Sequence, residues 1–94
     1  MQRHQILKII GANIRKARLK ANITQEGLAE MIDIHWKTLS YIETGKRDFG
    51  ASILAKIALA LKIPSDQVLD GISLSRENMA VVAKATKRKK AIST

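Results

Sequence analysis

The fold of this chain is decided by residues 23–47, which have the sequence ITQEGLAEMIDIHWKTLSYIETGKR. Apolar residues recur at helical spacing in two short runs within this stretch. The first run predicts a helix that begins at Gln25, and the second predicts a helix that begins at His35 or Trp36 and ends at about Thr44. Because only a few residues separate these two helices, they must cross at a sharp angle.

Small and apolar side chains are placed where the two helices would meet. Ala29 allows close contact between them. The wedge between the helices would be filled by Leu28, Ile34, Leu39 and Ile42. This packing presents the second helix outward, so that its polar side chains can enter a major groove about 12 Å wide. We therefore expect a helix-turn-helix over residues 25–44.

Three further helices are predicted around this pair, which gives an all-α domain of five helices over residues 1–71. Asn22 would end the first helix in a left-handed conformation, and Pro64 and Gly71 would end the fourth and the fifth. Ser65 is the expected N-cap of the fifth helix. The expected ranges of the three helices are 5–21, 51–62 and 65–70.

The charge of the chain favours a polyanionic partner. It has 17 Lys and Arg against 8 Asp and Glu, a formal charge of +9, which suits nucleic acid, with an anionic membrane as the competing partner. Residues 1–70 carry 11 basic and 7 acidic groups (+4), and residues 71–94 carry 6 and 1 (+5). Residues 72–94 are therefore a basic C-terminal tail, for which a short helix and an irregular chain both stay open.

Several function classes are disfavoured by the residues that the sequence lacks. It has no Cys, which excludes disulfides and thiolate metal sites, and His4 and His35 stand alone without metal-ligand spacing. Gly45-Lys46 lacks the upstream glycine of a phosphate-binding loop. We therefore expect no enzyme, no metal and no cofactor. The longest aliphatic run, residues 57–61, is too short to span a bilayer, which predicts a cytoplasmic protein.

Two strings, ITQEGLAE at residues 23–30 and TLSYIETGKR at residues 38–47, resemble the Cro/CI type of helix-turn-helix regulators, the XRE family. The resemblance covers residues 10–69. It implies a lambda-repressor-like domain that binds double-stranded DNA by sequence and regulates transcription. The chain departs from the family at Asp33, where Gly is usual, and at Asp48-Phe49, where Asn-Pro is frequent. Asp in a left-handed turn costs about 1 kcal/mol more than Gly.

The same resemblance indicates which side chains contact DNA. The expected base contacts are Trp36, Lys37, Ser40 and Tyr41. The expected phosphate contacts are Gln25, His35, Thr38, Lys46 and Arg47. Lys37 suits guanine O6 and N7, and Trp36 suits a thymine methyl group or a sugar. Other roles stay open, since Tyr41 could pack on its own helix, Trp36 could serve a dimer contact, and Lys46 and Arg47 could be a solvated loop.

Similar proteins also carry an Arg and a Glu at the positions of Arg18 and Glu43. This implies a partly buried structural ion pair between the first helix and the second helix of the helix-turn-helix, about residues 35–44, which is called the recognition helix. They usually bind palindromic sites as symmetric dimers. The apolar residues left here for a homodimer contact, unless they complete the core, are Ile63, Val68, Leu69, Ile72 and Leu74. Phage repressors and the controller proteins of restriction-modification systems are both similar, and the residues do not decide between them.

Two other functions remain as alternatives. One is an antitoxin that binds DNA through the same domain and a toxin protein through residues 72–94, since a basic tail with a few apolar anchors is compatible with folding on a partner. The other is RNA binding, which is disfavoured because Trp36 and Tyr41 are the only candidate stacking platforms.

Overall fold

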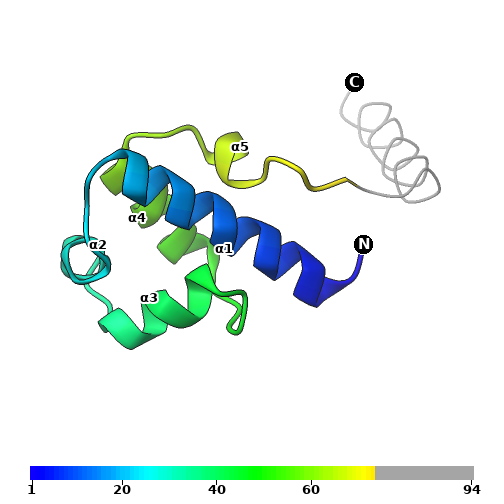
Figure 1. Cartoon of the computed structure of the whole chain (residues 1–94), viewed down its shortest axis with the longest axis horizontal. Helices are drawn as coiled ribbons and strands as arrows, with labels where there is room; N and C mark the ends of the chain where they lie inside the picture. Colours follow the sequence, from blue (N-terminus) through cyan, green and yellow to red (C-terminus); the bar gives the residue numbers. More distant parts are fainter. Residues whose placement is uncertain (74–94) are drawn as a thin grey trace, which may run out of the picture.

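The computed structural model describes residues 1–73 of the chain, and these residues form helices and no strands. The helices are α1 (Arg3–Lys20), α2 (Gln25–Met31), α3 (Trp36–Glu43), α4 (Ala51–Leu61) and α5 (Ser65–Val68). In Figure 1, α1 crosses the middle of the molecule, with α2 and α3 on one side of it and α5 on the other. The expected all-α fold with five helices is confirmed for this part of the chain. The possible helix within the tail lies outside the described residues.

Left-handed residues end the first three helices, and Asn22 does so at the predicted place. Asn22, Asp33 and Gly45 have φ values of 58°, 59° and 74°. After α3, the Lys46 N–H donates to the Tyr41 carbonyl at 2.9 Å, which closes the helix end. These turns set the direction in which each helix leaves the previous one. Lys62, with φ 55°, ends α4 in the same way, one residue before its predicted end.

Several predicted helix bounds differ from the structure, and α5 ends at Val68, two residues before its predicted end. Two of the differences at helix starts have local reasons. Helix α1 begins at Arg3, two residues early, because the Gln5 side chain accepts a hydrogen bond from the Gln2 N–H at 3.0 Å and satisfies a free donor of the first turn. Ser65 is not the N-cap of α5, because Pro64 takes the extended cap conformation with ψ 146°. Ser65 is instead the first helical residue.

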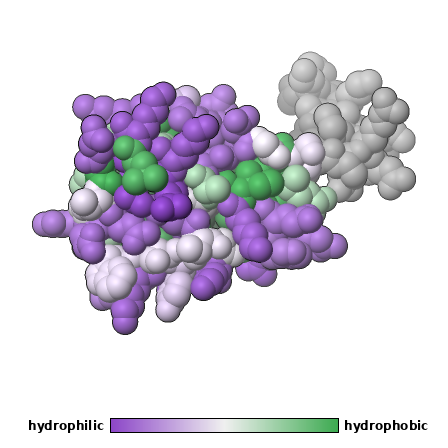
Figure 2. All heavy atoms as spheres, in the orientation of Figure 1, coloured by the Kyte–Doolittle hydropathy of each residue, from purple (hydrophilic) through white to green (hydrophobic). Residues whose placement is uncertain are grey.

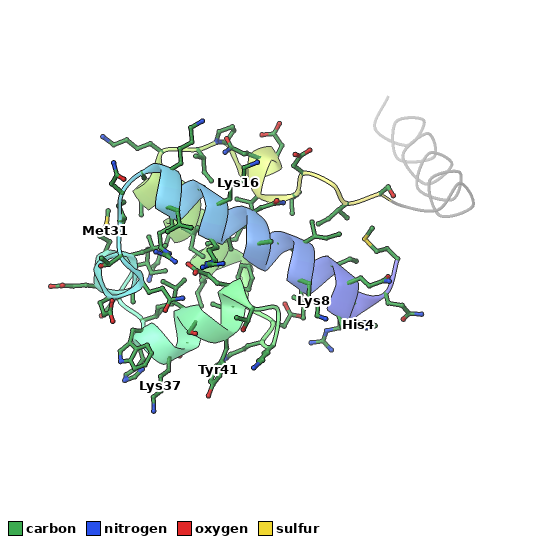
Figure 3. The ribbon with its side chains drawn as sticks, in the orientation of Figure 1. His4, Lys8, Lys16, Met31, Lys37 and Tyr41 are labelled. Carbon is green, nitrogen blue, oxygen red and sulfur yellow. The ribbon has the colours of Figure 1, made fainter. Side chains whose placement is uncertain are left out.

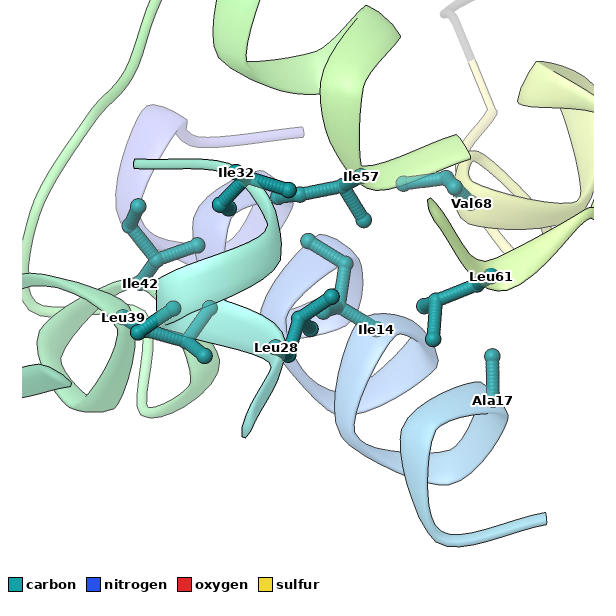
Figure 4. Close-up of a cluster of buried hydrophobic side chains, with 10 residues drawn as sticks. Ile14, Ala17, Leu28, Ile32, Leu39, Ile42, Ile57, Leu61 and Val68 are labelled. Atoms are coloured by element: carbon teal, nitrogen blue, oxygen red, sulfur yellow. The ribbon is translucent and has the colours of Figure 1, made fainter. Parts of the chain in front are cut away.

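All five helices contribute to one aliphatic core (Figure 4). Its members are Ile14, Ala17, Leu28, Ala29, Ile32, Leu39, Ile42, Ile57, Leu61 and Val68. Val68 is fully buried, so its assignment to a dimer contact is wrong and the alternative, that it completes the core, holds. Ile34 packs against the core while half-buried, as expected for the wedge between α2 and α3.

Helix α1 touches α3 through a glycine that the sequence did not single out. Gly11 is buried, and a Cβ atom added to it would lie 2.6 Å from the carbonyl oxygen of Glu43 and still closer to that of Ile42. The backbones of α1 and α3 are therefore as close as glycine allows. This contact fixes α3 against the rest of the domain. No helix within residues 1–73 is both long and apolar enough to cross a membrane.

Candidate nucleic-acid interface

Helix α3 buries one face and leaves the other exposed. Leu39, Ile42 and Glu43 point inward, whereas Trp36 and Tyr41 are 43% and 47% exposed. Figure 3 shows Lys37 and Tyr41 projecting from α3 away from the body of the molecule. The outer face of the recognition helix is therefore free to meet another molecule.

The start of α3 carries a small aromatic cluster with a positive charge. His35 is the N-cap, and its Nδ1 accepts a hydrogen bond from the Lys37 N–H at 3.1 Å. The His35 and Trp36 rings stack with their centroids 5.9 Å apart and an angle of 26° between their planes. Lys37 Nζ lies 5.9 Å from the centre of the Trp36 ring, within cation–π range. The Trp36 ring thus lies beside the side chains of both its chain neighbours.

The remaining residues expected on this surface are less prominent or lie in the loop. Thr38 and Ser40 are half-buried, and the Ser40 carbonyl accepts the Thr44 hydroxyl at 2.9 Å. Lys46 and Arg47 are exposed directly after α3. Within residues 1–73 neither of them forms an ion pair. The loop therefore presents two cations beside the C-terminal end of the recognition helix.

A buried polar network connects α1, α2 and α3 behind this surface. Arg18 donates to both carboxylate oxygens of Glu43, from Nε at 2.7 Å and from Nη2 at 3.0 Å, and the two side chains are 7% and 0% exposed. The ion pair is thus more deeply buried than the partly buried pair that the resemblance implies. Arg18 also donates to the Ile23 carbonyl at 2.9 Å. These bonds hold the end of α3 against α1 and the turn before α2.

Gln25, expected to bind a phosphate, belongs to the same network. Its Nε2 donates to Glu43 Oε1 at 3.0 Å, and the residue is half-buried in the first turn of α2. One of its two amide hydrogens is therefore committed inside the protein. The Gly27 N–H of the same turn is also committed, because it donates to Thr24 Oγ1 at 3.0 Å. The expected phosphate contact of Gln25 would therefore use its other amide hydrogen.

Sequence reasoning missed two contacts between the start of α1 and the loop after α3. Arg3 Nη2 lies 2.9 Å from Asp48 Oδ2, although 45 positions separate the two residues. Lys8 lies against Gly45, where an added Cβ would come within 2.7 Å of the Lys8 Cα atom. No local pattern signals either contact, because both depend on how α1 crosses α3.

Comparison with known proteins agrees with this geometry. A helix-turn-helix family model matches residues 14–68, more than half of the chain. The control protein C.BamHI of Bacillus amyloliquefaciens is 35% identical over 68 residues, which cover 71% of this chain and 84% of that protein.

Solved structures show the same fold. The restriction-modification controller protein C.AhdI from Aeromonas hydrophila has a TM-score of 0.64 at 26% identity, over 66% of this chain and 94% of that one. The clp gene regulator ClgR from Corynebacterium glutamicum has a TM-score of 0.66 at 28% identity, over 68% and 82% of the two chains. The antitoxin alternative gains no support from these relatives. Sequence and fold thus agree that the chain belongs to the XRE-type helix-turn-helix family.

Proposed function

We propose that this chain regulates transcription by binding duplex DNA at a specific sequence. Residues 1–71 form the DNA-binding domain. The protein acts in the cytoplasm, by binding and not by catalysis. The observation that carries the proposal is the outer face of α3, where Lys37 and Tyr41 project (Figure 3) and Trp36 is 43% exposed. The helix is held by the close contact at Gly11 and by the Arg18–Glu43 pair. A rigid helix with an exposed polar face is what entry into a major groove requires.

Each exposed side chain of α3 has a distinct part in this proposal. Lys37 donates to guanine O6 and N7, and the Trp36 ring covers a thymine methyl group. Tyr41 and Ser40 form hydrogen bonds with base edges. The phosphates are held by Gln25, His35, Thr38, Lys46 and Arg47, which set the register on the duplex without contributing to sequence choice.

We further propose a symmetric dimer, which places two recognition helices in successive major grooves about 34 Å apart. Apolar surface is available for this contact. Figure 2 shows small hydrophobic patches on a largely hydrophilic face of the molecule. Leu69 is 43% exposed and Ile72 is half-buried, whereas the half-buried Ile63 packs against the core. Leu59 on α4, absent from the predicted contact set, is 77% exposed, the highest value among the large hydrophobic residues of the described chain. Leu74 lies outside the described residues.

Selection of bound duplexes from a random pool, followed by sequencing, tests the proposal. The expected result is an enriched motif with twofold symmetry. Lys37→Ala should relax the preference at one position of each half-site and cost about 1–3 kcal/mol of discrimination there. Lys46→Ala is the matched control, since loss of a phosphate contact should weaken binding to all sequences about equally. A pool without any enriched motif would refute sequence-specific binding.

The two controller proteins among the relatives favour a controller role in a restriction-modification system over that of a phage repressor. The discriminating observation is the genomic position of the selected motif. In a controller, the motif should lie upstream of genes for a restriction endonuclease or a DNA methyltransferase. A motif found only elsewhere in the genome would count against this role.

A further inference from the structure

The N-terminal half of α1 is fastened to the loop that follows the recognition helix. Gly45, with φ 74°, leaves no room for a side chain, since an added Cβ would lie 2.7 Å from both Cα and Cγ of Lys8. Five residues before Lys8, the Arg3 guanidinium pairs with the Asp48 carboxylate at 2.9 Å. The first turns of α1 and residues 45–48 thus form one continuous surface.

This surface faces the same way as the recognition helix. Figure 3 shows His4 and Lys8 on the side of α1 toward which Lys37 and Tyr41 also project, whereas Lys16 lies on the other side of the helix. His4 and Lys8 are both exposed. Lys16 instead lines a shallow pocket of about 190 Å³ against the α5 region, together with Asn13 and Asp70. Two lysines of one helix therefore face different surroundings.

The positive charges on this side are not neutralised by nearby carboxylates. Both oxygens of Asp48 are engaged, since Oδ2 pairs with Arg3 and Oδ1 accepts the Phe49 N–H at 2.8 Å. Glu43 is buried against Arg18. Among residues 1–73, Lys8, Lys46 and Arg47 form no ion pair, so the surface keeps three cations beside the exposed side of α3.

We infer that Lys8, with His4 beside it, contacts the phosphate backbone of the DNA that α3 binds. The phosphate contacts of Lys46 and Arg47 would thus continue onto α1. This inference rests on the proposed DNA binding and adds a contact outside the helix-turn-helix. A phosphate contact of this kind increases affinity and fixes the orientation of the domain without selecting bases. The Arg3–Asp48 pair lies at the surface, and the Arg3 guanidinium offsets the charge of the Asp48 carboxylate, which would otherwise repel the backbone.

The salt dependence of binding to the selected duplex tests the role of Lys8. Each lysine–phosphate contact contributes about 0.9 to the slope of log K against log salt. Lys8→Gln should therefore lower the magnitude of the slope by about 0.9 per subunit and weaken binding to all sequences about equally. Lys16→Gln removes the same charge from the other side of α1 and should leave the slope unchanged. Lys8→Arg keeps the charge at position 8 and should show the wild-type slope.

Several outcomes separate this inference from the proposed function. Gln and Arg at position 8 both keep the Cγ atom that lies against Gly45. Thermal melts check that each variant is folded. If Lys8→Gln has a lower Tm than the wild type, Lys8→Met, which keeps the same aliphatic carbons, replaces it. Equal slopes for Lys8→Gln and Lys16→Gln, with a specific motif still bound, would overturn the α1 contact alone. Wild-type protein that binds no duplex specifically would instead overturn the proposed function and this contact with it.

Discussion

Removing the arginine of the buried ion pair should destabilise the domain more than almost any other single change. In Arg18→Met, the Glu43 carboxylate would stay buried with only the Gln25 amide, now 3.0 Å from Oε1, as a side-chain partner. The Ile23 carbonyl would also lose its donor at 2.9 Å. An unpaired buried charge is far more costly than an unpaired charge at a surface.

The magnitude follows from the burial of the pair. Breaking a buried ion pair by removing one partner costs about 3–5 kcal/mol. A domain of this size has a free energy of unfolding of only about 4–11 kcal/mol, at roughly 0.05–0.15 kcal/mol per residue. Arg18→Met should therefore lower Tm by about 12 °C or more. Glu43→Leu should have a similar effect, because the guanidinium is then left buried without its carboxylate.

The double variant Arg18→Met/Glu43→Leu provides the decisive comparison. An apolar pair of similar volume frequently replaces a buried ion pair at little cost, so the double variant should recover most of the stability that either single variant loses. Urea unfolding followed by circular dichroism gives the three free energies for a double-mutant cycle. Single losses under about 1 kcal/mol, or a double loss equal to the sum of the single losses, would refute the reasoning.

Three further predictions concern a close helix contact, a left-handed turn and a helix cap. Gly11→Ala should lower the free energy of unfolding in urea by about 1–3 kcal/mol or more, because its Cβ would meet the carbonyls of α3. Gly50→Ala, with open space around its Cβ, is the control and should lower it by under about 1 kcal/mol. Equal losses for the two variants would contradict the close contact at Gly11. Asp33→Gly should raise the urea midpoint, because glycine adopts the left-handed φ of 59° without strain. The net gain in the free energy of unfolding is about 0.5 kcal/mol once the entropy cost of glycine is subtracted. A lower midpoint would disprove this strain. Thr24→Ala should lower the free energy of unfolding by about 1 kcal/mol, because it removes the hydroxyl oxygen that accepts from the Gly27 N–H at 3.0 Å. Thr24→Ser keeps this cap and should have a Tm close to that of the wild type. Indistinguishable melts for the two variants would exclude a role of the cap.

The order and number of helices could be predicted from the sequence because the signals for them are local. Apolar spacing marks the buried face of each helix, and Asn22, Asp33 and Gly45 tolerate the left-handed conformation that ends three of them. The outer face of α3 could be predicted in the same way, since polar residues alternate with the apolar residues of one helical stripe. The resemblance to a family then indicated a partner for Arg18.

The tertiary structure alone decided which surfaces meet. A glycine within a helix lowers the stability of that helix. Gly11 is required only because α1 crosses α3 so closely that a side chain there would meet the carbonyls of α3. The crossing also brings Lys8 and Arg3 to the loop after α3, and turns the Gln25 amide toward Glu43. Helical periodicity specifies which face of a helix is apolar, but not which partner covers it or which distant side chain lies beside it. Those contacts depend on the packing of all five helices together, which no segment of the sequence encodes by itself.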